Sequence, residues 1–390
     1  LKGFNLACRS MGIIGNTGKC PGFALLMEMG TGKTITSIAI VGRAFLTGKI
    51  KRLLIFAPKF IVAVWDEEFS KFADFSYSLS VLMGSSVKKA EQLKGIPHNG
   101  LEIAVMNYDS VALLEKELSA WNPDFLICDE SSKVKNPSAK MSKATHRIAK
   151  RCKYRLILTG TPVQNNPLDF YSQYKVLDEQ IFGKSFYAFK NEYAILGTFN
   201  QPIGWRKLPE LVKKAHSIAF RVTKAEALYL PDMIDEIRPI ILEDKAQKLY
   251  RDFVRESYME LSKGEVTATN ILTRLLRLQQ ITGGFLRADE DSERYEQVSA
   301  AKLEALEDII DAAVSEGKKV VVIARFILEI KEICKMLEVK KIAYAYICGE
   351  VKDRATEVCE FQNNPECMVF VGQLQTVSMG LTLTASSTMV

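Results

Sequence analysis

Up to about residue 168, the chain alternates short apolar runs with amphipathic stretches. The apolar runs are rich in branched and aromatic side chains, which is typical of buried strands; they are Phe23–Leu26, Leu53–Ala57, Ile103–Met106, Phe125–Cys128 and Arg155–Leu158. Stretches between them, such as Thr34–Phe45 and Pro137–Lys150, predict helices, the second with Asn136 as its cap and Pro137 in its first turn. Alternating strands and helices predict a parallel, doubly wound sheet.

A second alternating pattern begins near residue 300. Helices are expected at Ala301–Ser315, Phe326–Leu337 and Ala355–Phe361, and strands at Lys319–Ala324, Ile342–Ile347 and Met368–Val371. The region between the two patterns differs: Leu168–Tyr193 and Leu208–Ala227 look helical and mixed, Asp244–Leu261 and Ala268–Gln280 predict long helices, and the polar stretch Ala288–Glu296 predicts a linker. We therefore expect a first α/β lobe at 1–166, helical insertions and a linker at 167–297, and a second, C-terminally incomplete lobe at 298–390.

Composition agrees with a globular protein. The chain has 390 residues, 47% of them hydrophobic and 25% charged, and no stretch approaches the eighteen apolar residues of a membrane-spanning helix. Its eight cysteines form no C-x-x-C pair, which argues against a zinc site, and Cys128 and Cys348 lie in apolar runs that predict buried thiols. This favours a reducing, intracellular setting, either the cytoplasm or nucleus or, for a viral protein, the host cell. Since the sequence opens at Leu1, we expect a piece of a longer protein.

Positive charge is concentrated in one part of the chain. The net charge is +6, and residues 131–155 hold nine Lys or Arg and no Asp or Glu. This stretch is either a solvated helix face or a contact surface for a polyanion.

Residues 27–34 form a glycine-rich segment between a predicted strand and a predicted helix, the context that a phosphate-binding loop needs. Gly30 and Gly32 let the backbone curl so that N–H groups face a phosphate, and the helix adds its positive N-terminal end. Lys33 can reach the β- and γ-phosphates, and the Thr34 hydroxyl can bind Mg²⁺. Methionine occupies the position of the first glycine of the strict pattern, and the alternative is an ordinary strand-to-helix turn.

Two further polar segments follow predicted strands. Asp129 and Glu130 come after Phe125–Cys128, where Asp129 would hold Mg²⁺ through water and Glu130 would orient and deprotonate an attacking water. The alternative is an acidic helix cap. Leu158–Pro162 places two hydroxyls on a tight turn that could sense the γ-phosphate, although an ordinary proline turn has the same pattern.

In this order, the segments resemble superfamily 2 helicases and, more narrowly, the Swi/Snf-related ATP-dependent DNA translocases. The resemblance covers nearly the whole chain and rests on Leu1–Asn5, Glu28–Thr34, Ala57–Lys59 with Trp65 and Glu68, Asp129–Asn136, Leu158–Asn166, Arg221 with Lys224, Leu230 and Pro231, Val320–Phe326, Gly349 with Arg354, and Gln373–Thr384. It implies two RecA-like parallel-sheet lobes with helical insertions between them, ATP and Mg²⁺ as cofactors, and duplex DNA as a sequence-independent partner.

The resemblance and the motifs together assign a role to each candidate residue. The catalytic candidates are Lys33, Asp129 and Glu130; the nucleotide contacts are Asn5, Met29, Gly30, Thr31, Gly32, Lys33 and Thr34; the Mg²⁺ ligands are Thr34 and Asp129; the coupling residues are Thr159, Gly160 and Thr161. The nucleic-acid contacts are Pro58, Lys59, Lys135, Asn136, Arg325, Gln373, Thr376 and Gly380.

The chain departs from the family pattern in three places. Asn5 stands where the family usually has Gln, Val377 and Ser378 replace a glycine pair, and Val390 precedes the motif that normally supplies arginine fingers. The expected function is therefore a DNA-stimulated ATPase that translocates along or remodels duplex DNA. A strand-separating DNA or RNA helicase and an ATP-switched nucleic-acid scaffold with little turnover remain alternatives, whereas the second α/β lobe argues against a P-loop kinase.

Overall fold

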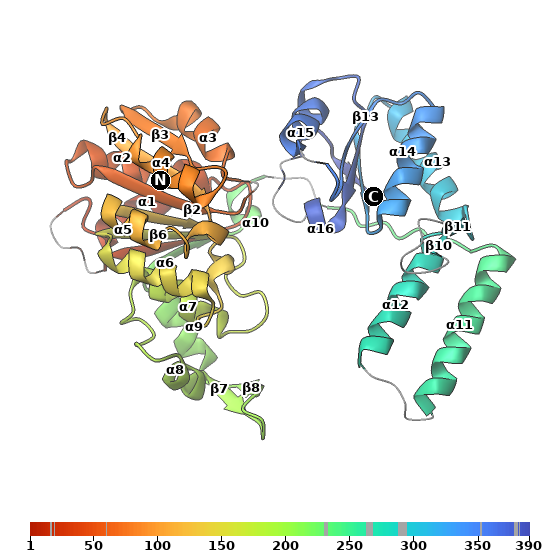
Figure 1. Ribbon diagram of the computed structural model, residues 1–390, viewed down its shortest axis with the longest axis horizontal. Coiled ribbons are helices and arrows are strands. Elements are labelled where there is room, and N and C mark those ends of the chain that lie inside the picture. The colour runs from red at the N-terminus through yellow and green to blue at the C-terminus, as the bar shows by residue number, and fades with distance from the viewer. Residues whose placement is uncertain are drawn as a thin grey trace. The chain divides into compact units, whose positions relative to one another are not determined.

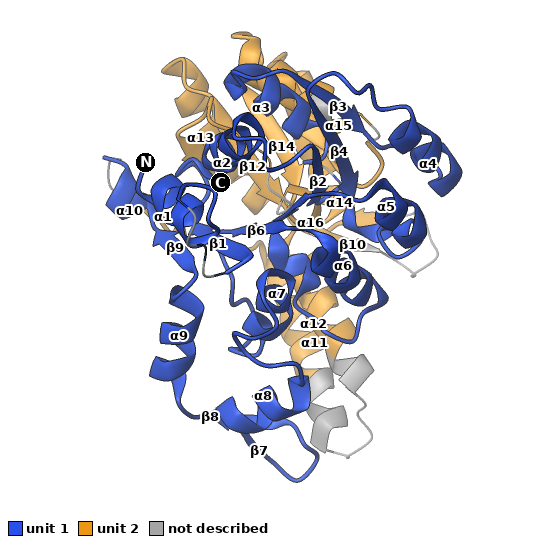
Figure 2. Cartoon of the chain, turned by 90° about the vertical axis from the view of Figure 1, so that its left-hand side faces the viewer, with its two compact units in different colours: residues 1–232 blue, residues 233–390 orange. Residues whose placement is uncertain are grey.

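The chain folds into two compact units, Leu1–Asp232 and Met233–Val390 (Figure 2). The computed structural model describes residues 1–15, 18, 20–59, 61–229, 233–262, 268–287, 295–351, 353–377, 381 and 383–390. Among these, no helix combines the length and the apolar character needed to cross a membrane. The lobe boundaries expected from the sequence, 1–166, 167–297 and 298–390, stay a prediction.

The first unit is built on a seven-stranded sheet in the order β3-β4-β2-β5-β6-β1-β9, in which every pair of neighbours is parallel. The strands are β1 (Gly22–Met27), β2 (Arg52–Ala57), β3 (Tyr77–Val81), β4 (Leu101–Asn107), β5 (Phe125–Asp129), β6 (Tyr154–Thr159) and β9 (Ala219–Val222). The predicted parallel sheet and its five predicted strands are confirmed.

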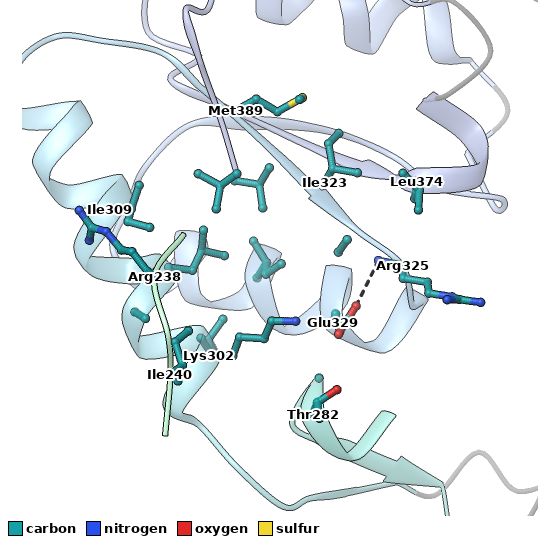
Figure 3. Close-up of a pocket in the computed structure, with 18 of the residues that line it drawn as sticks. Arg238, Ile240, Thr282, Lys302, Ile309, Ile323, Arg325, Glu329, Leu374 and Met389 are labelled. Atoms are coloured by element: carbon teal, nitrogen blue, oxygen red, sulfur yellow. Dashed lines mark hydrogen bonds between the residues drawn. The ribbon is translucent and has the colours of Figure 1, made fainter. Parts of the chain in front are cut away.

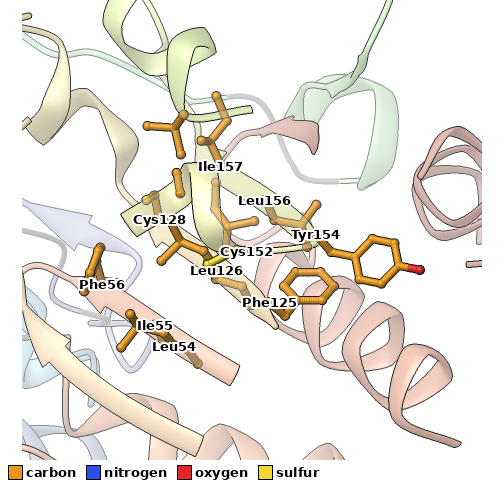
Figure 4. Packing of buried hydrophobic residues seen from close by; sticks show 14 of the residues in the cluster. Leu54, Ile55, Phe56, Phe125, Leu126, Cys128, Cys152, Tyr154, Leu156 and Ile157 are labelled. Atoms are coloured by element: carbon orange, nitrogen blue, oxygen red, sulfur yellow. The ribbon is translucent and has the colours of Figure 1, made fainter. Parts of the chain in front are cut away.

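The central strands of this sheet are buried on both faces. Figure 4 shows Leu54, Ile55 and Phe56 of β2 together with Leu126 and Cys128 of β5, and each of these side chains is fully buried. Burying an aliphatic or aromatic side chain of this size contributes about 1.5–3 kcal/mol. Burial raises the pKa of the Cys128 thiol far above its usual value, so it is a neutral core side chain. The expected burial of the thiols at 128 and 348 is confirmed.

Helices connect the strands of the first unit (Figure 1). They are α1 (Lys2–Ser10), α2 (Lys33–Leu46), α3 (Val64–Phe72), α4 (Ser86–Lys94), α5 (Glu115–Trp121), α6 (Lys140–Arg151), α7 (Asp169–Leu177), α8 (Phe186–Tyr193), α9 (Leu208–His216) and α10 (Lys224–Ala227), with 3₁₀ turns at Tyr108–Ser110 (η1) and Ser131–Val134 (η2). A hairpin of β7 (Ala194–Leu196) and β8 (Pro202–Trp205) follows α8.

One local prediction is wrong. Helix α6 begins at Lys140 with Ala139 as its cap, because the Asn136 side chain accepts a hydrogen bond from Ser138 N (2.9 Å) and closes a separate turn around Pro137. The stretch Leu208–Ala227, expected to be helical and mixed, contains two helices with β9 between them, a strand that was not predicted. This strand is short and lies at the sheet edge, so it lacks the periodicity of a buried strand and depends on its pairing with β1.

The second unit has a four-stranded parallel sheet in the order β13-β14-β12-β15. Its elements are α11 (Asp244–Ser262), α12 (Ala268–Thr282), β10 (Phe285–Arg287), β11 (Tyr295–Gln297), α13 (Ala301–Ser315), β12 (Val320–Ala324), α14 (Ile327–Val339), β13 (Tyr344–Ile347), α15 (Arg354–Asn363), β14 (Val369–Gln373), α16 (Leu374–Val377) and β15 (Thr388–Met389). Figure 1 shows α11 and α12 side by side as a helical hairpin. Of the predicted linker Ala288–Glu296, residues 288–294 lie outside the described residues.

The start of β1 packs tightly against α7, and a substitution at this contact tests the fold. A Cβ atom on Gly22 would lie 2.6 Å from Leu177 Cα, a backbone atom that cannot move aside cheaply. We expect Gly22→Ala to lower the free energy of unfolding by about 1–3 kcal/mol through overpacking. Urea denaturation measures this. Gly95→Ala is the matched control, since its Cβ would meet nothing closer than 3.4 Å, and we expect a change within about 0.5 kcal/mol. Equal effects of the two substitutions would contradict the packing argument.

Candidate functional site

Three polar segments meet at the carboxyl edge of the first sheet. Strand β6 pairs with β1 on one side and with β5 on the other, so the segments that follow these strands lie next to one another. They are the glycine-rich loop after β1, the acidic pair at the end of β5, and the turn after β6. Ligands of parallel α/β sheets bind at this edge, and the structure brings together the catalytic candidates that the sequence spreads over about a hundred residues.

The loop after β1 has a backbone that requires glycine. Gly30 and Gly32 have φ values of 81° and 90°, in the left-handed region that other residues rarely adopt. Thr31 closes the turn, because its N–H and its hydroxyl both donate to Glu28 O, at 3.2 and 2.7 Å. Gly32 caps α2, whose first N–H groups have no intrahelical acceptors and whose N-terminus carries partial positive charge. The loop therefore presents donors to an anion.

Lys33 carries the clearest indication of a ligand. Its Nζ is buried and has no hydrogen-bond acceptor among the described residues. Its nearest counter-charge is Glu130 Oε1, at 3.6 Å, which is beyond hydrogen-bond length. A Cβ on Gly160 would lie 3.7 Å from Lys33 Nζ, so the lack of a side chain there keeps the space beside the amine open. A buried ammonium without an acceptor is costly, and this arrangement fits a phosphate group.

Asp129 is buried and held by three hydrogen bonds. Its Oδ1 accepts from Glu130 N (3.0 Å), its Oδ2 from Trp65 Nε1 (3.1 Å), and its backbone oxygen from the Tyr108 hydroxyl (2.7 Å). Burial raises the pKa of the Asp129 carboxyl to about 6, and the negative charge of Glu130 adds to this. A buried carboxylate that needs a counter-charge fits Mg²⁺; Thr34, the other predicted ligand, is half-buried in the first turn of α2.

Glu130 has an unusual backbone conformation. Its φ is 46° although it is not glycine, and such conformations cost roughly 1–3 kcal/mol and cluster at functional sites. This turn of the chain accompanies the approach of the Glu130 carboxylate to Lys33. The side chain is 26% exposed, so the carboxylate remains open to water.

The turn after β6 is fixed by its own first threonine. Thr159 is fully buried, and its hydroxyl accepts a hydrogen bond from Thr161 N (3.1 Å). Gly160 lies against the loop after β1, since its Cβ would be 3.3 Å from Met27 O. Of the three predicted coupling residues, Gly160 therefore lies beside the loop, and Thr159 and Thr161 bond to each other within the turn.

For Asn5 and Met29, the structure gives less indication of a role at this site than for the other candidates. Asn5 lies on an exposed face of α1, and its side chain forms no hydrogen bond with the residues that the structure describes. Met29 is about half exposed at the outer side of the loop. Their assignment as nucleotide contacts stays a prediction.

Sequence analysis missed the partners that hold the acidic pair. Trp65 lies on α3 and Tyr108 on η1, and neither spacing nor periodicity indicates that they bond to Asp129. Trp65 is within a segment that carries the family resemblance, which is the only signal that could have drawn attention to it.

The nucleic-acid candidates of the first unit lie beyond the strands β2 and β5. Pro58 is buried and Lys59 is exposed directly after β2. Lys135 Nζ donates to Gln164 Oε1 (2.8 Å), and Asn136 is exposed. Because β2 and β5 are neighbours, these residues share the carboxyl edge of the sheet.

The rest of the basic stretch 131–155 is partly neutralised. Arg147 forms two hydrogen bonds with the Glu115 carboxylate, and Lys150 pairs with Glu179 at 2.8 Å. Arg155 is mostly buried, and it donates to the backbone oxygens of Leu177 and Cys152. These pairs favour the interpretation of α6 as a solvated helix face.

The candidates of the second unit follow neighbouring strands of the second sheet. Ala324 pairs with Gln373, so Arg325 and Gln373 lie at the same edge. Gln373 Oε1 accepts from Gly349 N (3.0 Å) and from the Thr376 hydroxyl (3.5 Å). Gly380 and Ser378 lie outside the described residues.

A cavity of about 890 Å³ lies beside Arg325 in the second unit. Figure 3 shows Glu329 bonding to the backbone of Arg325, with Lys302, Ile323 and Ile309 on the surrounding walls. None of the other candidate residues lines this cavity. It therefore adds nothing to the nucleotide site of the first unit.

Comparison with known proteins supports the resemblance. The family model of the SNF2-related domain matches residues 16–283. The chain is 27% identical over 95% of its length to the uncharacterized ATP-dependent helicase MG018 of Mycoplasma genitalium, and 24% identical over 97% of its length to the DNA repair and recombination protein RDH54 of Saccharomyces cerevisiae. It covers 35% and 46% of those proteins, so it spans less than half the length of either.

A solved structure shares the fold. The Sulfolobus solfataricus SWI2/SNF2 ATPase core in complex with dsDNA matches all of this chain and 80% of its own, with a TM-score of 0.50 and 24% identity. The predicted architecture of two RecA-like lobes with helical insertions is confirmed. Since the family match also covers more than half of the chain, the protein belongs to the SNF2-related family.

Proposed function

We propose that this chain is a DNA-stimulated ATPase that uses the energy of ATP hydrolysis to translocate along or remodel duplex DNA. The observation that carries the proposal is the buried Lys33 amine at the N-terminus of α2, which has no hydrogen-bond acceptor in the described part of the chain and lies 3.6 Å from Glu130. The proposal is supported by relatives that are named as a helicase and as a DNA repair protein, and by a fold neighbour in complex with dsDNA. A DNA substrate implies an intracellular site of action.

The proposed nucleotide chemistry uses groups at the edge of β1, β5 and β6. The loop N–H groups and Lys33 bind the phosphates, with Asn5, Met29 and Thr31 as further nucleotide contacts. Thr34 and Asp129 would hold Mg²⁺, which neutralises phosphate charge when bound. Lys33 turns from Glu130 to the arriving phosphate, and this frees the Glu130 carboxylate to take a proton from the attacking water.

The proposed DNA contacts are mostly to phosphates and therefore independent of sequence. In the first unit they are Pro58, Lys59, Lys135 and Asn136; in the second they are Arg325, Gln373, Thr376 and Gly380. Thr159, Gly160 and Thr161 are the proposed coupling residues, and the position of Gly160 beside Met27, Glu28 and Lys33 supports this. A strand-separating helicase is the second candidate, since two relatives carry the name helicase. An oligonucleotide displacement assay distinguishes it, because a translocase leaves the duplex intact.

The first prediction concerns Glu130. We expect Glu130→Gln to lower turnover by roughly 10²–10⁴ and to leave ATP affinity intact, because the phosphate ligands remain. Single-turnover hydrolysis and titration with a fluorescent ATP analogue measure the two effects. Lys33→Ala should abolish the binding, and Glu67→Gln, on an exposed position of α3, should change neither. Full turnover in Glu130→Gln would exclude this residue as the base.

The second prediction concerns Asp129 and pH. The Asp129 pKa is raised from 3.8 to about 6 by burial, so the native protein holds an extra proton between these values and loses stability as pH rises through about 6. Without nucleotide or Mg²⁺, we expect Asp129→Asn to be more stable than the parent at pH 7.5 by roughly 1–3 kcal/mol, and this gain should vanish near pH 4. Thermal unfolding from pH 4 to 8 measures it.

Asp66→Asn, on an exposed position of α3, is the control for this pH effect, and its stability curve should run parallel to that of the parent. Lower stability of Asp129→Asn at pH 7.5 would show that the buried charge is compensated within the protein.

The third prediction concerns DNA. We expect duplex DNA to stimulate steady-state ATP hydrolysis at low salt, and salt to weaken the binding. Lys59→Ala should lower the slope of log affinity against log salt by about 1, as expected for one lost phosphate contact. Lys94→Ala is the control, because this exposed lysine ends α4 ahead of the amino end of β4. Absence of stimulation by both single-stranded and duplex DNA would favour an ATP-switched scaffold.

A further inference from the structure

A buried glutamine, Gln173, links the acidic pair to the turn after β6. Its Oε1 accepts a hydrogen bond from the Ser131 hydroxyl (2.7 Å), and its Nε2 donates to Pro162 O (2.7 Å) and to Asp169 O (2.8 Å). Gln173 and Ser131 are both fully buried. One side chain on α7 therefore joins the residue after Glu130 to the residue after Thr161.

A second contact joins the same two segments farther along the chain. Lys135 Nζ donates to Gln164 Oε1 (2.8 Å), and the backbone of Gln164 is itself fixed by Asp169, whose Oδ2 accepts from Gln164 N (3.0 Å) and Asn165 N (2.9 Å). Residues 131–135 and 162–165 are thus tied at two points, with α7 as their common support. The buried tie through Gln173 is the stronger of the two, since the bond between Lys135 and Gln164 is exposed.

The Gln173 contact also anchors the residue that follows Glu130. Glu130 has a positive φ and precedes Ser131 directly. The Ser131 hydroxyl is bonded to Gln173, so the chain immediately after Glu130 is anchored and its strained conformation is maintained. Loss of this anchor leaves Glu130 free to relax away from the position beside Lys33.

An amide suits this place because it accepts and donates at once. A methionine or leucine could fill the same space, but it could bond neither the Ser131 hydroxyl nor Pro162 O. Burying the amide gains little stability by itself, since its hydrogen bonds mainly offset the loss of bonds to water. A connection between the two segments gives the residue a role beyond packing.

We propose that Gln173 is a positioning residue that holds Glu130 in place for hydrolysis. This rests on the proposed function of the site. The Ser131–Gln173–Pro162 chain of hydrogen bonds keeps the segment after Glu130 in register with the turn after β6. The substrate class and the reaction are those already proposed.

The test compares turnover with ATP affinity in the complete 390-residue chain. Gln173→Met keeps length and apolar volume and removes the amide. We expect kcat in the presence of duplex DNA to fall roughly 10–100-fold, as misplacement by a fraction of a bond length does, while ATP Kd changes by less than about twofold because ground-state binding is untouched. A residue that only packs would lower the melting temperature and leave kcat per folded molecule unchanged.

Two further variants separate positioning from folding. Ser131→Ala removes only the link to the acidic pair, so it should reproduce the loss of kcat, and the double variant should be no worse than Gln173→Met alone. Ser142→Ala is the matched control, because this buried hydroxyl donates to the backbone oxygen of Val134 in η2 (3.3 Å) but bonds to neither Gln173 nor the turn after β6. Its kcat should equal that of the parent.

The outcomes distinguish this proposal from the proposed function. If the parent and Ser142→Ala hydrolyse ATP with DNA stimulation, and Gln173→Met or Ser131→Ala does so at full rate, the positioning role is overturned and the function stands. Additive losses in the double variant would also overturn it. If the parent chain shows no DNA-stimulated turnover, the proposed function fails and the role of Gln173 fails with it.

Discussion

The site depends on one constraint, the parallel pairing of β6 between β1 and β5. This pairing places the loop after β1, the acidic pair and the turn after β6 at a single edge, although they are far apart in the chain. Each segment alone is an ordinary strand end with polar residues. Side by side, they bring an ammonium and a carboxylate to 3.6 Å and leave a glycine facing the space between them. The buried strands supply the rigidity that holds this geometry.

Two buried charged groups at this edge of the sheet are incompletely compensated, and this explains why the edge can bind charged ligands. The Lys33 amine is buried and finds no hydrogen-bond acceptor among the residues that the structure describes, and burial raises the pKa of the Asp129 carboxyl to about 6. Both groups lower the stability of the protein by itself, and both would be relieved by a phosphate and a divalent cation. The positive φ of Glu130 is a further cost at the same place. In a site of this kind, the groups that lower the folding stability also raise the affinity for a charged ligand.

The links through Gln173 give this edge a connection to the nucleic-acid candidates. Ser131, Pro162 and Gln164 belong to segments that interact with different ligands in the proposed function, and α7 supports them all. The second unit places Arg325 and Gln373 at the corresponding edge of its own parallel sheet. Family membership accounts for the shared architecture at 24–27% identity, whereas this chain's own hydrogen bonds determine how its segments are joined.

The sequence by itself determined five buried strands of the first sheet, the glycine loop and the acidic pair, because each is encoded by neighbouring residues. Apolar runs specify buried strands, and Gly30 and Gly32 supply a conformation that depends only on their own backbone. The tertiary structure alone decided that β9 completes the sheet, that Trp65 and Tyr108 hold Asp129, and that Gln173 bonds to Ser131. These features depend on hydrogen bonds between residues tens of positions apart, and no local periodicity records such a bond. The start of α6 at Lys140 depends instead on a local turn, because Asn136 accepts from Ser138 N.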